Sequence, residues 1–201
     1  MILEILKPAA ILSLFISSLL GRLTTEQKDQ LLKIHNDIRI RVGHGMVHGQ
    51  PPAANMKQMQ WNDEAAIRAQ KWADKCQFDH DPAKNRKFNS YRWVGQNIAY
   101  WYSQNVTEGV QFWFDEVKGF DFYTGNCKKF TCLHYTALVW ANTDMVGCGL
   151  ADCSNYKMGN MYLVCNYAPG GNIGYQKPYK VGMPCTECPE RFHCNGNELC
   201  H

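Results

Sequence analysis

The residues of this chain best suited to chemistry are its cysteines. The sequence of 201 residues contains ten of them. Four lie near the C-terminal end with the spacing Cys185-x2-Cys188-x5-Cys194-x5-Cys200. An even number of cysteines behind an N-terminal signal peptide favours disulfides in an oxidising compartment. We therefore predict that every cysteine has a partner and that no thiol is left as a nucleophile.

The histidines are the second candidates. His44 and His48 are four residues apart, but glycines flank both of them, which argues against a helix. We expect this pair to lie on a mobile surface loop, and His35 to pack within the first helix. The sequence has no Gly-x-Ser-x-Gly, no His-Glu-x-x-His and no glycine-rich phosphate loop. The motifs of common hydrolases and nucleotide-binding enzymes are thus missing.

Three aromatic residues, Phe120, Phe122 and Tyr123, lie between two glycines just before Cys127. Exposed rings on a loop with glycine hinges are suited to holding an apolar ligand. We expect these three rings to contact a lipid. The alternative is that they form a local core.

The N-terminal residues 1–21 are predicted to be a secretory signal peptide, with Lys7 before an uncharged stretch that is too short to span a bilayer comfortably. The alternative is an amphipathic or core helix. No later segment approaches 18 uninterrupted apolar residues, so we expect a secreted, extracellular protein that does not span a membrane. Asn105-Val106-Thr107 is an acceptor sequence for N-glycosylation at Asn105.

Composition narrows the class of protein further. Hydrophobic residues make up 45% and charged residues 19% of the chain, which is typical of a globular protein and excludes a disordered tail, collagen or a coiled coil. The net charge is +3 and no run of basic residues is present. This balance argues against a nucleic-acid partner.

The elements that must position these residues are helices mixed with short strands. Thr24 and Gln27 have the spacing of a capping box, and apolar residues then recur at helical spacing as far as Val42. Further helices are predicted from Asn62 or Asp63, from a cap at Thr107, and over 134–140. Strands are predicted over 94–102, 145–151 and 161–167. We predict an α+β fold with antiparallel strands.

The last part of the chain, residues 181–201, differs in composition. It contains mostly glycine, proline, cysteine and polar residues. Such a segment cannot fold by burying apolar surface alone, so we expect disulfides to hold it as a small appendage.

Four stretches together resemble the CAP superfamily, which comprises cysteine-rich secretory proteins, venom antigen-five proteins and plant pathogenesis-related proteins. They are residues 35–39 (HNDIR), 95–99 (GQNIA), 134–143 (HYTALVWANT) and 164–172 (VCNYAPGGN). The resemblance covers residues 25–180, and the tail resembles the two-disulfide hinge that follows this domain in cysteine-rich secretory proteins. It implies a signal peptide over 1–21, a CAP domain over 22–180 with a three-layer α-β-α sandwich, and a hinge-like tail over 181–201.

The resemblance also implies how the cysteines pair and which residues form a cleft. The implied pairs are Cys76–Cys153, Cys148–Cys165, Cys185–Cys194 and Cys188–Cys200, which leaves Cys127 and Cys132 to close a short loop. The family's cleft presents two histidines and two acidic residues, which carry over to His80, Gln96, Glu116 and His134.

Two imidazoles and one carboxylate, from His80, His134 and Glu116, are a reasonable set of ligands for Zn²⁺. The sequence departs from many relatives at Gln96, where they carry glutamate. An amide cannot act as a general base and is a poor ligand for a cation. The alternative is that the four residues form a buried hydrogen-bond network, and we expect no required cofactor.

We therefore expect a secreted, non-enzymatic CAP-domain protein that binds a sterol, a fatty-acid-like lipid or an extracellular protein. A venom-type modulator of ion channels or receptors is one alternative, although the family's channel-regulating C-terminal module is missing. A metal-dependent peptidase is the other, and Gln96 argues against it.

Overall fold

A four-stranded sheet runs through the centre of the molecule. The computed structural model describes residues 22–128, 131–154, 157 and 159–201, so the predicted signal peptide lies outside the described residues. The strand order is β1-β3-β4-β2, with β1 parallel to β3 and the other neighbours antiparallel. The strands are β1 (Gln60–Trp61), β2 (Gly95–Trp101), β3 (Met145–Asp152) and β4 (Met161–Ala168). The three predicted antiparallel strands are confirmed, whereas β1 has two residues and is too short to show an alternating pattern.

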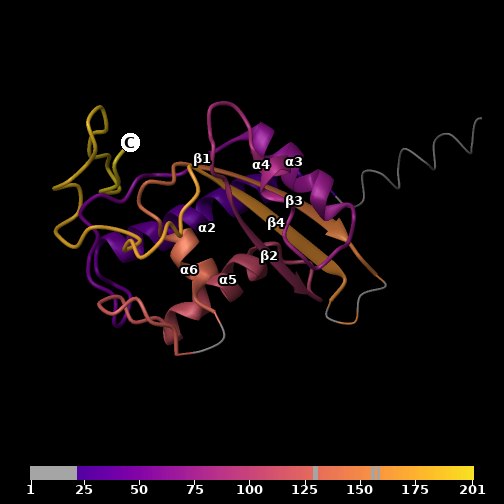
Figure 1. Cartoon of the computed structure of the whole chain (residues 1–201), viewed down its shortest axis with the longest axis horizontal. Helices are drawn as coiled ribbons and strands as arrows, with labels where there is room; N and C mark the ends of the chain where they lie inside the picture. The colour runs from indigo at the N-terminus through magenta and orange to yellow at the C-terminus, as the bar shows by residue number, and fades with distance from the viewer. Residues whose placement is uncertain (1–21, 129–130, 155–156, 158) are drawn as a thin grey trace, which may run out of the picture.

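Helices cover both faces of this sheet, which confirms the α+β fold and its three layers. Helices α3 and α4 lie on one side, and α5 and α6 lie on the other (Figure 1). Helix α2 packs against α5 and α6. The helices are α2 (Thr25–Gly43), α3 (Asp63–Ala73), α4 (Ala83–Arg86), α5 (Thr107–Asp115), the 3₁₀ helix η1 (Glu116–Gly119) and α6 (Leu133–Leu138).

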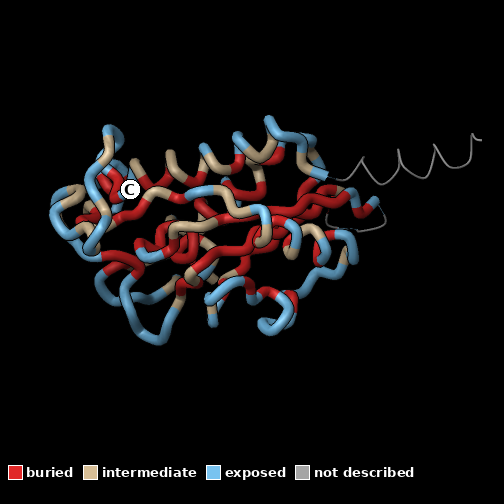
Figure 2. The backbone as a smooth tube through the Cα atoms, turned by 90° about the horizontal axis from the view of Figure 1, so that it is seen from above, coloured by how far each residue is buried: buried red, intermediate tan, exposed pale blue. Residues whose placement is uncertain are grey.

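The alternation of side chains along β4 assigns its two faces. Tyr162 and Val164 pack in the cluster that contains Trp72 of α3. Leu163 and Tyr167 point to the opposite face, into the larger cluster with α2 and α5. Because successive strand residues point to opposite sides, one short strand contributes to both cores. In Figure 2 the buried residues follow the strands, and the exposed ones lie in loops and outer helix turns.

Glycines in β3 set the distance between the sheet and α3. A Cβ atom added to Gly147 would lie 2.3 Å from the backbone nitrogen of Ala66, and one added to Gly149 would lie 2.3 Å from that of Gln70. No side chain fits in that space, so the helix backbone rests directly on the strand. This close approach holds α3 in place over β3 and β4.

Two of the three helix N-caps that the sequence suggests are present in the structure. The Thr24 hydroxyl accepts a hydrogen bond from the Gln27 N–H at 3.2 Å, and the Gln27 side chain accepts one from the Thr24 N–H, as predicted. Asn62 caps α3 through the N–H of Ala65. The predicted cap at Thr107 is wrong, because its hydroxyl donates to Asn105 Oδ1 at 2.8 Å and Thr107 is the first helical residue.

A buried arginine joins α2 through hydrogen bonds to the chain around α6. Arg39 is fully buried, and its guanidinium donates to five backbone carbonyls, those of Lys57, Leu138, Trp140, Ala141 and Thr143. Burial lowers the pKa of Arg39 to about 9. Since a charge without hydrogen-bond partners is costly to bury, these carbonyls compensate for the lost hydration. The sequence resemblance included Arg39 without indicating this role.

The structure contains the five disulfides that the resemblance implies. They are Cys76–Cys153, Cys127–Cys132, Cys148–Cys165, Cys185–Cys194 and Cys188–Cys200. The tail is held by more than its disulfides. Leu199 is 1% exposed and belongs to the main core, and the backbone of Cys200 bonds to Met56 and Gln58. The tail therefore packs onto one end of the domain (Figure 1).

Candidate functional site

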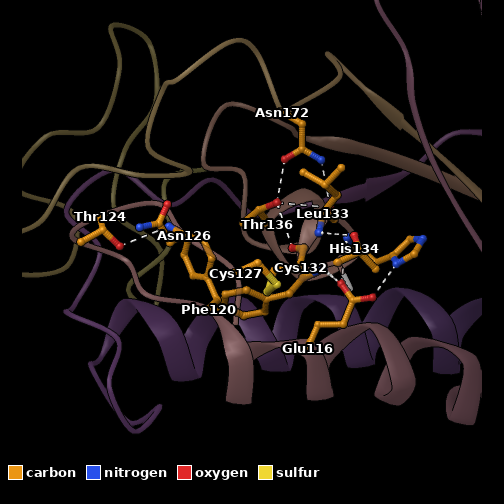
Figure 3. The surroundings of a disulfide bond; sticks show 12 residues. Glu116, Phe120, Thr124, Asn126, Cys127, Cys132, Leu133, His134, Thr136 and Asn172 are labelled. Carbon is orange, nitrogen blue, oxygen red and sulfur yellow. Dashed lines mark hydrogen bonds and ion pairs between the residues drawn. A yellow bond between two sulfur atoms is a disulfide. The ribbon is translucent and has the colours of Figure 1, made fainter. Parts of the chain in front are cut away.

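One half of the cleft is an ion pair between Glu116 and His134. Glu116 Oε1 accepts from His134 Nδ1 at 2.6 Å, and Oε2 accepts from the backbone N–H groups of His134 and Tyr135 at 3.0 and 3.1 Å (Figure 3). These two N–H groups belong to the first turn of α6, so the carboxylate also caps that helix. A carboxylate only accepts, so Nδ1 of His134 carries a proton, and in the neutral ring Nε2 would hold the lone pair.

The other half of the cleft joins His80 to Gln96. Asn166 donates from Nδ2 to the carbonyl of Ala65, so its Oδ1 is free to accept from Gln96 Nε2 at 3.0 Å. Gln96 Oε1 then accepts from the N–H of Asp81 and from His80 Nδ1, each at 3.0 Å. The carbonyl of Ala65 can only accept and the N–H of Asp81 can only donate. These two groups therefore set the donor and the acceptor of each hydrogen bond between them. His80 therefore also presents an unprotonated Nε2.

The environment keeps His80 neutral. Burial lowers the pKa of His80 below its ordinary value of 6.5, and the positive charges of Arg86 and His134 lower it further. The hydrogen bond to Gln96 acts in the opposite direction. Imidazole nitrogens are common ligands of divalent metal ions, so His80 and His134 are the two side chains of the cleft that suit one.

Glu116 fits a supporting role better than that of a direct ligand, because three hydrogen bonds occupy its oxygens. Among the described residues, Cys185, Cys188 and Cys200 are the cysteine, histidine or acidic residues that bring three ligand atoms within 4.8 Å of one another, and all three are in disulfides. His80, Glu116 and His134 do not form such a group. The zinc assignment stays a prediction, carried by the two imidazoles.

The other histidines have structural partners. His35 is buried, with Nδ1 bonded to the carbonyl of Leu31 at 2.7 Å and Nε2 to the hydroxyl of Tyr167 at 2.9 Å. Burial lowers the pKa of His35 to about 4. His44 lies in the turn after α2, where its Nε2 is 3.1 Å from a Glu198 carboxylate oxygen of the tail. The loop is on the surface as expected, and His44 ties it to the tail.

The aromatic loop is only partly exposed. Tyr123 is 73% exposed, but Phe122 is 3% exposed and its ring packs on Tyr179 at a centroid distance of 4.6 Å. Phe120 is half-buried against Tyr135. The expectation that all three rings are exposed is therefore wrong for Phe122. The cause is residues 172–180, which return over the loop, and Lys177 Nζ donates to the carbonyls of Phe122 and Tyr123.

The aromatic loop and residues 172–178 enclose a groove of about 450 Å³ beside the Cys127–Cys132 disulfide. Apolar side chains on its wall and rim are Phe120, Leu133, Trp140 and Tyr175. Leu133 is 62% exposed, and Tyr175 is fully exposed. We call this feature the loop groove. The sequence prediction included Phe120 but missed the opposite wall, because residues 172–178 show no periodic pattern.

The floor of the loop groove is held by a short hydrogen-bond chain (Figure 3). Thr136 donates from its hydroxyl to Asn172 Oδ1 at 2.7 Å, and Asn172 donates from Nδ2 to the carbonyl of Leu133 at 2.9 Å. These bonds join the start of α6 to the segment after β4. His134 lies next to Leu133, so α6 separates the loop groove from the polar cleft and contributes to both.

Asn105 is exposed in the turn before α5, and its Oδ1 accepts from both the N–H and the hydroxyl of Thr107. Within the described part of the chain, its Nδ2 makes no hydrogen bond that would hold it back from modification. Glycosylation at Asn105 stays a prediction.

Comparison with known proteins identifies the family. The family model described as "CAP: Cysteine-rich secretory protein family" matches residues 32–167. Scoloptoxin SSD976 of Scolopendra dehaani is 41% identical over 172 residues, which are 83% of this chain and 80% of that protein. Venom allergen 5 of Vespula pensylvanica is 42% identical over 173 residues, 79% of this chain and 82% of that protein. The chain belongs to the CAP family, as its sequence resemblance implied.

Solved structures agree with this assignment. Venom allergen-like protein 4 of Schistosoma mansoni has a TM-score of 0.70 at 29% identity, over 83% of this chain and all of that chain. NaASP2, in a structure determined with Zn²⁺, has a TM-score of 0.71 at 28% identity, over 89% and 96% of the two chains. The protein is thus a CAP-domain protein of the venom allergen and cysteine-rich secretory type. No helix among the described residues is long and apolar enough to cross a membrane.

Proposed function

We propose that this protein is an extracellular binding protein that holds a sterol or another long-chain lipid in the loop groove. The observation that carries the proposal is the groove itself, whose rim exposes Leu133 and Tyr175 to solvent. Five disulfides support an extracellular setting, since such bonds persist in oxidising compartments.

The size and lining of the loop groove suit a lipid. Its volume of about 450 Å³ lies within the range of pockets that bind small molecules. A ring system or acyl chain can lie against Phe120 and Trp140, and a hydroxyl headgroup can bond to Thr124 or Asn126. The two walls come from segments joined by Lys177, so separation of that contact widens the groove.

The polar cleft supports binding without turnover. Gln96 occupies a position where a carboxylate would be needed as a base, and its amide is already bonded on both sides. Glu116 is bonded to His134 and to the start of α6. We propose that the cleft orders α6 and that it binds zinc through His80 and His134 without a required catalytic role.

The test is equilibrium binding of radiolabelled cholesterol to the purified disulfide-bonded protein, followed by extraction of the lipid. The double variant Leu133→Ser, Tyr175→Ser removes exposed apolar surface without touching the core, and we expect it to bind at least tenfold more weakly. Ile67→Ser on α3 is the matched control, because Ile67 is 55% exposed on the other side of the sheet. Equal binding by the double variant, or recovery of chemically altered lipid, would overturn the proposal.

A second candidate is binding of an extracellular protein partner. It is favoured by relatives that are named scoloptoxin and venom allergen. The same exposed rim, with Tyr123 and Tyr175, would serve as the contact surface. Folded protein that binds no lipid would shift the assignment to this candidate.

A further inference from the structure

Positive charge is concentrated in one part of the chain. Residues 68–92 contain seven basic and three acidic side chains, a net charge of +4, whereas the whole chain carries +3. The remaining 176 residues therefore sum to −1. This segment comprises the end of α3, α4 and the loops around them. Helices α3 and α4 lie on the side of the sheet opposite α5 and α6, and the loop between them carries His80 of the cleft (Figure 1). We call its surface the α3–α4 basic surface.

Most of these cations are free to meet a ligand. Lys71, Lys84, Lys87 and Arg92 are exposed, and within the described residues none has a carboxylate oxygen within 4.0 Å. The other three cations have local contacts. Arg86 is buried and lies over the Trp93 ring at 5.9 Å. Arg68 pairs with Glu64 at 2.8 Å, and Lys75 lies over the Trp72 ring at 4.3 Å.

The acidic residues of the segment are already engaged in hydrogen bonds. Asp81 is 5% exposed and accepts from the Asn85 side chain. Asp79 accepts from the backbone N–H of His80, and Asp74 accepts from Gln70. Asp74 and Asp79 remain exposed next to the lysines and reduce the local charge without neutralising it.

Three of the cations line a cavity in this surface. A cavity of about 240 Å³ is lined by Arg68, Lys71, Trp72, Lys75, Asp81 and Asn85. Arg68 also donates to the carbonyl of Asn85 at 3.0 Å, which joins α3 to α4 and fixes one side of the cavity. Trp72 is 6% exposed, so no apolar side chain of this cavity is available for insertion into a bilayer.

Two of these lysines lie close together at one end of α3. Lys71 is in the last turn of the helix and Lys75 is in the turn that follows it. Neither contributes to the core. Two exposed cations that lie close together without a carboxylate partner are suited to a ligand that carries negative charge.

We propose that the α3–α4 basic surface binds a sulfated polysaccharide, with one sulfate group in the cavity between Arg68, Lys71 and Lys75. The cations extend from α3 across α4 to Arg92, which suits an extended polyanion better than a single small anion. In the extracellular setting that the disulfides support, sulfated glycans are the polyanions that a secreted protein meets. The surface lies on the other side of the sheet from the loop groove, so the two ligands can bind together.

The test is affinity for immobilised heparin, measured with the full disulfide-bonded protein at about 0.15 M NaCl and then over a salt series. The variant Lys71→Gln, Lys75→Gln should bind at least tenfold more weakly. The slope of log affinity against log salt should fall by about two, as each contacting cation releases about one counterion. The matched control is Lys33→Gln, Lys118→Gln, which removes the same charge from exposed positions elsewhere and should change affinity less than twofold.

Two results would overturn the proposal. Equal loss of affinity in both double variants would show that only net charge matters. Stronger binding to phosphatidylserine vesicles than to heparin would assign the surface to membranes instead. Unchanged thermal unfolding of both variants shows that any difference arises at the surface and not from the fold.

Discussion

The polar cleft and the loop groove lie on the two sides of α6 and use opposite chemistry. In the cleft, His80, Gln96, Glu116 and His134 make their hydrogen bonds to one another and to the backbone. In the loop groove, Leu133 and Tyr175 expose apolar surface that nothing in the described chain covers. Satisfied polar groups stabilise a fold, whereas uncovered apolar surface is available for a ligand. The comparison therefore supports the proposal that the loop groove, and not the cleft, is the lipid site.

The largest expected effect comes from removing the carboxylate of the cleft. Glu116→Ala leaves His134 Nδ1 and two N–H groups of α6 without their acceptor. We expect the free energy of unfolding to fall by about 4 kcal/mol, since each unsatisfied group costs about 1–3 kcal/mol. Chemical denaturation measures this loss. Leu133→Ser on the groove side is the control, with an expected change within about 0.5 kcal/mol. Equal losses would contradict the division between cleft and groove.

A second effect concerns His35, a core histidine whose two ring nitrogens are both hydrogen-bonded. Its pKa is lowered from 6.5 to about 4 in the folded protein, so the fold requires the neutral ring. As the pH falls below 6.5, the His35 imidazole takes up a proton in the unfolded chain but stays neutral in the folded protein. The free energy of unfolding should therefore decrease from about pH 6.5 to about pH 4, by about 3 kcal/mol.

The variant His35→Gln should be less stable at neutral pH but should lose this part of the pH dependence. His48→Gln is the control, because His48 is exposed on the surface loop and should leave the profile unchanged. Unfolding curves at several pH values measure both. If His35→Gln keeps the pH profile of the unaltered protein, as His48→Gln should, the role given to His35 is wrong.

A smaller effect is expected at Gln96, whose amide joins His80 to Asn166. Gln96→Glu removes the donor to Asn166 Oδ1, so the free energy of unfolding without metal should fall by about 1–2 kcal/mol. The same change adds an anionic group beside His80 and should tighten Zn²⁺ binding. Calorimetric titration measures the affinity. Binding should weaken at acid pH, because protons compete for the imidazole lone pairs.

The matched control for the zinc prediction is the double variant His80→Ala, His134→Ala, which removes both free Nε2 atoms. We expect it to bind no zinc at concentrations that saturate the unaltered protein. Undiminished binding would show that the ion, if it binds, uses other groups.

The sequence predicted the fold well, because its signals are local or shared by the family. The capping box at Thr24, the cap at Asn62 and the alternation along β4 each depend on residues close in sequence. The cap at Thr107 was predicted wrongly because Asn105 Oδ1, two residues earlier, accepts both the N–H and the hydroxyl of Thr107. The choice between them depends on the geometry of the turn.

The candidate site was predictable only in part. The resemblance located His80, Gln96, Glu116 and His134, but it could not show that Glu116 also caps α6. The burial of Phe122 depends on Tyr179, which is 57 residues later in the sequence. Contacts over such distances leave no periodic pattern, so the opposite wall of the loop groove was missed.

Photo-crosslinking with a photoactivatable cholesterol analogue, followed by peptide mapping, tests directly whether the loop groove binds lipid. We expect labelled peptides to come from the two walls of the loop groove, residues 120–127 and 131–140 on one side and 172–178 on the other. An excess of unlabelled cholesterol should abolish this labelling. Labelling confined to peptides from α3 and α4, or labelling that cholesterol does not compete, would contradict the assignment of the loop groove as the lipid site.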